Sequence, residues 1–336
     1  MISTSIGDLA QTMSNRMQMT RLKSNLGTLT YEMSSGKKED IASEVRGEFS
    51  AVSALEGSLK TLAAYENSVT EGVLLFDTAQ ASLTLINDLT VEAGPNLILS
   101  SEVSDPAMLK AAGEDAEQKL ATVVSALNVS VSGRAIFGGA ATDGSPLISA
   151  EEIMDELTAL VAGAPTPADA LALVDSWFSD AGGGFETLAY QGSADPMTAI
   201  PVGPDERLAQ SITAADPAIR EVMSSFASAA LVARGAFDGD AQLQADLIGA
   251  AGEAMLSSET GLSVIQAELG AQQAFLDGVS GHLDTQKSTY QMALNEIYAA
   301  DPYEVATQLE AVALQLETMY AVTSRLSSLS MTEYLR

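Results

Sequence analysis

Apolar residues near the N-terminus recur with the alternating three- and four-residue spacing of a coiled coil. The pattern slips once in phase after residue 13 and continues to residue 33, where Ser34-Ser35-Gly36 follows. This spacing places apolar side chains on one face of a helix, and glycine suits the left-handed position after a helix end. We therefore predict a helix that ends near residue 35. Its apolar stripe consists of Ile2, Ile6, Leu9, Met13, Met19, Leu22, Leu26, Leu29 and Met33.

The C-terminal residues carry the most regular heptad pattern of the chain. Asp301-Pro302 precedes it, and proline fits the first turn of a helix. An amphipathic helix gains most of its stability from packing its apolar face, so the two terminal stripes must pack against each other or against other chains. The C-terminal stripe consists of Val305, Leu309, Val312, Leu316, Met319, Thr323 and Leu326.

Two further long helical patterns lie inside these termini. One runs from Val45 to Leu83, and Gly94-Pro95 is expected to end that helix. A shorter helix is expected after Asp105-Pro106. A second long pattern runs from Leu262 to Ile297.

Glycine and proline are concentrated between Gly133 and Pro217. Within this stretch residues 150–178 still have a helical pattern, which Pro165 and Pro167 divide. Short strands are predicted at residues 185–190, 197–202 and 207–213, the last two on either side of the turn at residues 203–206. Asp216-Pro217 is expected to open another helix.

These patterns predict a mainly α protein in which long N- and C-terminal helices form a coiled coil and a helical bundle, with a small mixed α/β central insertion. We expect three parts. Residues 1–40 with 301–336 form a terminal coiled coil that polymerises along an axis. Residues 41–140 with 217–300 form the helical-bundle core, and residues 141–216 form an outward-facing insertion.

Composition removes several kinds of catalytic and metal site. The chain has no cysteine, which excludes disulfides, thiolate zinc sites and cysteine nucleophiles, and it has one histidine, His282. His282 lies beside Leu283 on a predicted helix, where a polar surface position is the simpler interpretation. Asp238 and Asp240 have the spacing of a calcium loop, but the rest of that consensus is missing. We expect no catalytic residues, no metal and no cofactor.

The net charge of −29 is distributed unevenly. Residues 1–60 carry seven basic and seven acidic side chains, and residues 301–336 have a net charge of −3, so nearly all of the acidic excess lies between them. Nucleic acid is not expected as a partner, because phosphate binding needs clustered lysine and arginine. Nearly neutral ends can pack against copies of themselves without large repulsion.

No targeting or membrane segment is predicted. Residues 1–8 lack the basic start and apolar run of a cleavable signal peptide. No run of about 18 apolar residues is present, so neither a membrane span nor a membrane partner is expected.

Four segments resemble the flagellin superfamily, and within it the hook-associated proteins of type 3, which form the hook-filament junction. They are residues 1–5 (MISTS), residues 29–38 (LTYEMSSGKK), residues 132–140 (SGRAIFGGA) and residues 326–336 (LSSLSMTEYLR). Ala135 stands where that family usually has an aromatic residue. Residues 38–47 lack the segment that usually follows the first helix in flagellins, which argues against a standard flagellin.

The resemblance implies a structural subunit that is exported without a cleaved signal peptide and acts outside the cell in the flagellum. Its implied partners are copies of itself in a ring, another hook-associated protein, flagellin and an export chaperone. Polymerisation would use the terminal stripes: Ile2, Ile6, Leu9, Met13, Leu22, Leu26, Leu29, Val305, Leu309, Val312, Leu316, Met319 and Leu326.

Other functions remain open at this point. The chain could be a divergent flagellin, the main subunit of the filament. It could also be a helical surface adhesin or binding module. The same stripes could pair only within one chain, without polymerisation. An enzyme is the most distant alternative, because no spacing of carboxylates marks a catalytic pair.

Overall fold

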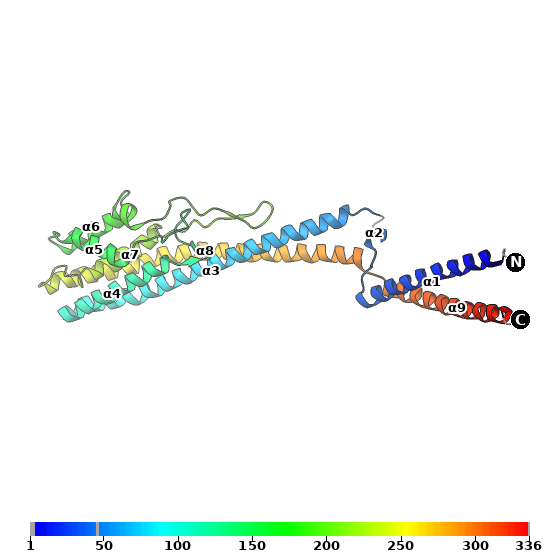
Figure 1. The fold of residues 1–336 in the computed structure, drawn as a ribbon. Coiled ribbons are helices and arrows are strands. Elements are labelled where there is room, and N and C mark those ends of the chain that lie inside the picture. Colours follow the sequence, from blue (N-terminus) through cyan, green and yellow to red (C-terminus); the bar gives the residue numbers. More distant parts are fainter. Residues whose placement is uncertain (1–3, 45–46, 335–336) are drawn as a thin grey trace. The chain divides into compact units, whose positions relative to one another are not determined.

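The computed structural model describes residues 4–44 and 47–334, with side chains described for residues 10–42 and 47–325. Most of this chain is helical, which confirms the predicted mainly α class with long terminal helices (Figure 1). The helices are α1 (Thr4–Ser35), α2 (Ile41–Glu44), α3 (Ser50–Val103), α4 (Pro106–Leu127), α5 (Ala150–Val161), α6 (Pro167–Ser179), α7 (Pro217–Ala230), α8 (Ala241–Tyr298) and α9 (Pro302–Tyr334). Two short antiparallel pairs join β1 (Ser130–Val131) to β2 (Arg134–Ala135) and β3 (Ile200–Pro201) to β4 (Arg207–Leu208).

The chain divides into two compact units. The first contains Met1–Thr61 and Asp284–Arg336, and the second contains Leu62–Leu283. Helices α3 and α8 contribute residues to both units. The three-part division expected from the sequence stays a prediction.

Aspartate-proline pairs begin three of the helices, as the sequence predicts. The Asp105 carboxylate accepts hydrogen bonds from the backbone N–H groups of Ala107 and Met108, at 3.0 and 3.1 Å. Asp216 accepts from the Ala218 N–H at 3.2 Å, and Asp301 caps α9 in the same manner. Each carboxylate satisfies N–H groups that have no partner in the first turn, while the following proline has no N–H to satisfy.

The predicted end of the second long helix at Gly94-Pro95 is wrong, because α3 continues through both residues to Val103. Gly94 is buried against α8, where a β-carbon built on Gly252 would lie 2.9 Å from the Gly94 carbonyl oxygen. Pro95, the next residue along the helix, is exposed. The two glycines therefore allow two helices to approach closely. The predicted start at Val45 lies outside the described residues.

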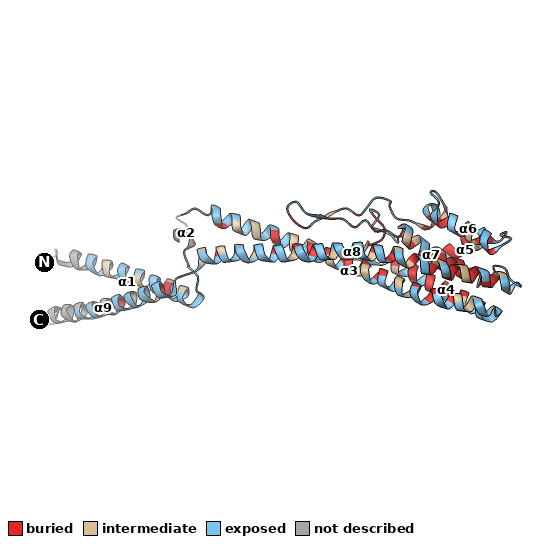
Figure 2. Cartoon of the chain, turned by 180° about the vertical axis from the view of Figure 1, so that it is seen from behind, coloured by how far each residue is buried: buried red, intermediate tan, exposed pale blue. Residues whose placement is uncertain are grey.

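The second unit has an extensive core in which α7 packs against α4, α5 and α6. In Figure 2 the buried residues gather around these helices. Leu109, Leu120, Ile219 and Phe226 are fully buried there. A partly exposed ion-pair network crosses its edge, since Arg234 bonds to Asp155 at 2.8 Å and also to Glu117.

The strand predicted at residues 185–190 is wrong, because Phe185–Ala189 form a short π-helix, η1. The Tyr190 N–H donates to the Phe185 carbonyl oxygen at 2.8 Å. Phe185 packs among aromatic rings, with its centroid 5.6 Å from that of Phe178 and 6.2 Å from that of Tyr190. Gly184 passes directly against the Trp177 indole, where no β-carbon would fit.

The two strands predicted around the turn at residues 203–206 form a hairpin, although its paired strands are shorter than expected. Val202 and Leu208 are buried. A β-carbon built on Gly72 would lie 2.8 Å from the Leu208 Cδ2 atom and 3.4 Å from Leu276, so the hairpin rests on α3 and α8. Whether the whole insertion faces outward in an assembly stays a prediction.

Candidate assembly surface

The first unit is built around α1 and α9, which lie side by side (Figure 1). Gly36 ends α1 with φ +69° and donates its N–H to the Glu32 carbonyl oxygen at 2.8 Å. The two connecting segments then pair as a single β-bridge between Lys37 and Ala299. Its bonds run from the Ala300 N–H to the Gly36 carbonyl oxygen, at 3.0 Å, and from the Lys38 N–H to the Tyr298 carbonyl oxygen, at 2.9 Å. This bridge fixes the lengthwise register of the two helices.

A small apolar core lies directly beside the bridge. Leu29 of α1 is 7% exposed, and Ala300 and Val305 are each 6% exposed. Leu309 and Val312 pack against these three residues and stay half-buried. Full burial of one such aliphatic side chain stabilises a fold by roughly 1.5–3 kcal/mol. We call α1 and α9 the helical hairpin, and the end next to the bridge its base. The helical hairpin therefore has a few strongly stabilising contacts at its base.

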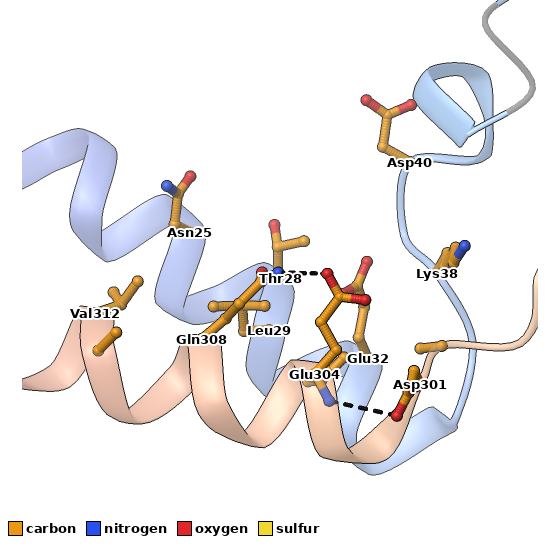
Figure 3. A pocket seen from close by; sticks show the side chains of 13 residues that line it. Asn25, Thr28, Leu29, Glu32, Lys38, Asp40, Asp301, Glu304, Gln308 and Val312 are labelled. Atoms are coloured by element: carbon orange, nitrogen blue, oxygen red, sulfur yellow. Dashed lines mark hydrogen bonds between the residues drawn. The ribbon is translucent and has the colours of Figure 1, made fainter.

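An open pocket of about 540 Å³ lies at this end of the hairpin (Figure 3). Asp301 borders it and accepts from the Tyr303 N–H at 2.8 Å, while Gln308 donates to Glu304 at 3.0 Å. No cluster of metal-ligating side chains occurs among the described residues. The pocket lining is Asn25, Thr28, Leu29, Glu32, Lys38, Asp40, Ala300, Asp301, Glu304, Val305, Gln308, Ala311 and Val312.

Tyr298 connects the base of this unit to the start of α3. Its hydroxyl donates to Glu56 at 3.0 Å. Partial desolvation, followed by the hydrogen bond and the negative charge of Glu56, raises the pKa of the Tyr298 hydroxyl. The tyrosine therefore stays protonated as a donor at neutral pH.

Farther along the hairpin, apolar side chains are exposed. Met13 is 63% exposed, Met17 55% and Leu314 65%. A shallow groove of about 520 Å³ is lined there by Gln18, Arg21, Leu22, Leu314, Gln315, Thr318 and Met319. Exposed apolar patches rimmed by polar residues are typical of protein-protein contacts.

The predicted seam residues fall into three groups. Leu29, Val305 and Leu316 are buried, and Leu22, Leu26, Leu309, Val312 and Met319 are half-buried, whereas Met13 is exposed. Ile6 and Leu9 lie in α1 and Leu326 lies in α9, but their side chains are outside the described part. Ile2 also lies outside the described residues. The role of all thirteen residues in polymerisation stays a prediction.

Sequence reasoning missed several residues of this surface. Ala300 lies outside both heptad patterns, and only the pairing of the connecting segments brings it into the core. Met17 and Leu314 are apolar but fall between seam positions. The Lys23 ammonium group lies 5.8 Å from the centroid of the Tyr320 ring, which places a cation-π contact across the hairpin.

His282 is exposed on α8, as the polar-face interpretation predicts. None of the described helices has the length and apolarity needed to cross a membrane.

The C-terminal part of this surface also matches a known protein family. Residues 250–335 match the model of the bacterial flagellin C-terminal helical region. The chain carries a flagellin C-terminal region. This C-terminal match indicates a flagellin-like structural protein and not an enzyme, as the sequence resemblance implies.

Two solved structures have the same fold as this chain. One is a Vibrio parahaemolyticus protein described as a flagellar hook-associated protein, with 11% identity, a TM-score of 0.51, and coverage of 72% of this chain and 94% of that one. The other is FlgL from Bacillus cereus, with 14% identity, a TM-score of 0.50, and coverage of 70% and 96%. A comparison with curated proteins finds no match.

Proposed function

We propose that this flagellin-family chain is the hook-filament junction subunit, which joins other hook-associated proteins to the flagellin filament. The observation that carries the proposal is the hairpin of α1 and α9, which buries one narrow seam and leaves other apolar side chains exposed on both helices. Such a surface suits packing among several copies. The resemblance of residues 132–140 and 326–336 to junction proteins, and the fold of two hook-associated structures, support the junction assignment over other flagellar roles.

In this proposal the protein acts outside the cell. It is exported through the flagellar apparatus without cleavage, with an export chaperone, and then forms a ring of copies between another hook-associated protein and the first flagellin. The polymerising residues are the seam residues of α1 and α9. No nucleic acid and no membrane take part.

A deletion strain tests the proposal. We expect loss of the gene to leave hooks intact and filaments absent, with flagellin shed into the medium, because flagellin would have no surface on which to start. The measurements are electron microscopy of cells and the amount of flagellin in the medium, with a strain complemented by the wild-type gene as the control. Normal-length filaments on the deleted strain would contradict the junction role.

A divergent flagellin is the second candidate, because the matching family model describes flagellins. Immunogold labelling distinguishes the two. A junction subunit is expected only at the base of the filament, in few copies, whereas a flagellin is expected along its whole length.

A further inference from the structure

The two terminal helices carry opposite charges. Between residues 10 and 31, α1 has three basic side chains and no acidic one, namely Arg16, Arg21 and Lys23. Between residues 302 and 324, α9 has three acidic side chains and no basic one, namely Glu304, Glu310 and Glu317. This separation is unusual in a chain with a net charge of −29, because most of its helices are acidic.

The opposite charges do not satisfy each other within one chain. All six side chains are exposed. Among the described side chains no ion pair joins the three cations of α1 to α9, and Lys23 instead lies over the Tyr320 ring. Glu310 and Glu317 directly follow the seam residues Leu309 and Leu316, so each is turned about 100° around the helix from the buried seam. They therefore lie to the side of the seam and not within it.

The spacing of the charges is the same on the two helices. Arg16 and Lys23 are seven residues apart, and so are Glu310 and Glu317. Seven residues make nearly two helical turns, about 10.5 Å along the axis, so each pair forms a row on one face of its helix. We call Arg16 and Lys23 the basic row, and Glu310 and Glu317 the acidic row.

We propose that the basic row of one copy lies against the acidic row of the neighbouring copy, an inference that rests on the proposed function. Each molecule then offers one row to each of two neighbours, which is the head-to-tail contact that builds rings and filaments. Contacts between two copies of α1, or two copies of α9, bring like charges together and are disfavoured. The exposed Met17 and Leu314 supply apolar area beside the rows.

Charge reversal of whole rows in the full-length protein tests this pairing. One variant carries Arg16→Glu and Lys23→Glu, a second carries Glu310→Lys and Glu317→Lys, and a third carries all four changes. A control matched to the first variant carries Lys110→Glu and Arg207→Glu, which reverse two exposed cations of the second unit and change the net charge as the first variant does. Circular dichroism checks that every variant keeps its helix content, and sedimentation velocity measures self-association across a range of salt concentrations.

Each two-residue row reversal is expected to weaken self-association roughly tenfold. An equal mixture of the two is expected to restore it, because each reversed row then meets an opposite row. The variant with all four changes is expected to associate with itself but not with the wild type. The control is expected to behave as the wild type, and salt is expected to weaken wild-type association.

The outcomes separate this inference from the proposed function. If the wild type assembles and the row reversals have no more effect than the control, or if the mixture fails to recover, the pairing of rows is wrong and polymerisation still stands. A wild-type protein that stays monomeric at every salt concentration contradicts the pairing of rows, whereas the deletion strain tests the junction role separately.

Discussion

Two aspartates with the same capping role have different surroundings. Asp105 caps α4 at an exposed site, whereas Asp216 caps α7 at a half-buried site. Burial, and then the nearby negative charge of Glu268, raise the pKa of the Asp216 carboxyl, and these effects outweigh the hydrogen bond from Ala218 and the charge of Arg220. Aspartate therefore caps both helices, but at Asp216 burial also removes water from the carboxylate.

The burial of Asp216 predicts how its contribution to stability depends on pH. Because its folded-state pKa is raised, Asp216 contributes stability that is complete below the ordinary pKa of an aspartate and is lost as the pH rises through the folded-state pKa. We expect Asp216→Asn, which keeps the cap, to increase the free energy of unfolding at neutral pH. The wild type is expected to become more stable through this group as the pH falls from neutral to about 4.5, and Asp216→Asn should reduce that gain.

The matched substitution is Asp105→Asn, which should change the stability at neutral pH by no more than about 0.5 kcal/mol. Urea unfolding at neutral pH and at about pH 4.5 measures the free energy of unfolding of both variants. Equal effects of the two substitutions would show that burial at Asp216 is not what distinguishes the sites.

At the scale of elements, helix starts were predictable and helix interiors were less so. Asp105, Asp216 and Asp301 each precede proline, and this local pattern determines a helix start without help from distant residues. Gly94-Pro95 has the local pattern of a break, but the contact with Gly252 makes the close approach of two helices favourable there. The strand prediction at residues 185–190 is also wrong, because tertiary packing brings Trp177 and Phe178 against these residues and local spacing does not show it. For the same reason, the sequence alone does not show whether the terminal seams pack against each other or against other chains.

Leu208 of the hairpin of β3 and β4 is buried directly over Gly72, and Val202 of the same hairpin is also buried. We expect Leu208→Ala to reduce the free energy of unfolding of the second unit by about 2–4 kcal/mol, because it removes buried methyl groups and leaves a cavity. The neighbouring exposed Arg207 offers the matched control, and Arg207→Ala should change stability by less than about 0.5 kcal/mol. Chemical denaturation followed by circular dichroism measures both. If the two variants are equally stable, the hairpin is not anchored by Leu208.

At the scale of the whole molecule, the two units differ in how much they bury. Among the described side chains of the α1–α9 hairpin few aliphatic ones are buried, with Leu29, Val305 and Leu316 as the large ones, whereas α7 alone buries nine residues in the second unit. Ordering each backbone residue costs about 1–2 kcal/mol, so a two-helix hairpin with one narrow seam is close to the limit of stability. Packing among copies would cover the exposed faces.

Amide hydrogen exchange on the unassembled protein tests this contrast. We expect amides between Val305 and Leu326 to exchange much faster than those between Ile219 and Ala230, because the hairpin opens without disturbing the second unit. In the assembled flagellum the same C-terminal amides should become protected. Slow exchange of residues 305–326 in the free protein would show that the hairpin is already stable and that folding is not coupled to assembly.

The bridge between Lys37 and Ala299 also has a mechanical consequence. Its two hydrogen bonds lie on either side of the paired residues and run across the two chain segments. A force that slides the segments past each other loads both bonds at once, whereas a force that peels them apart loads one bond after the other. The base of the hairpin therefore resists shear along the helix axes better than it resists peeling.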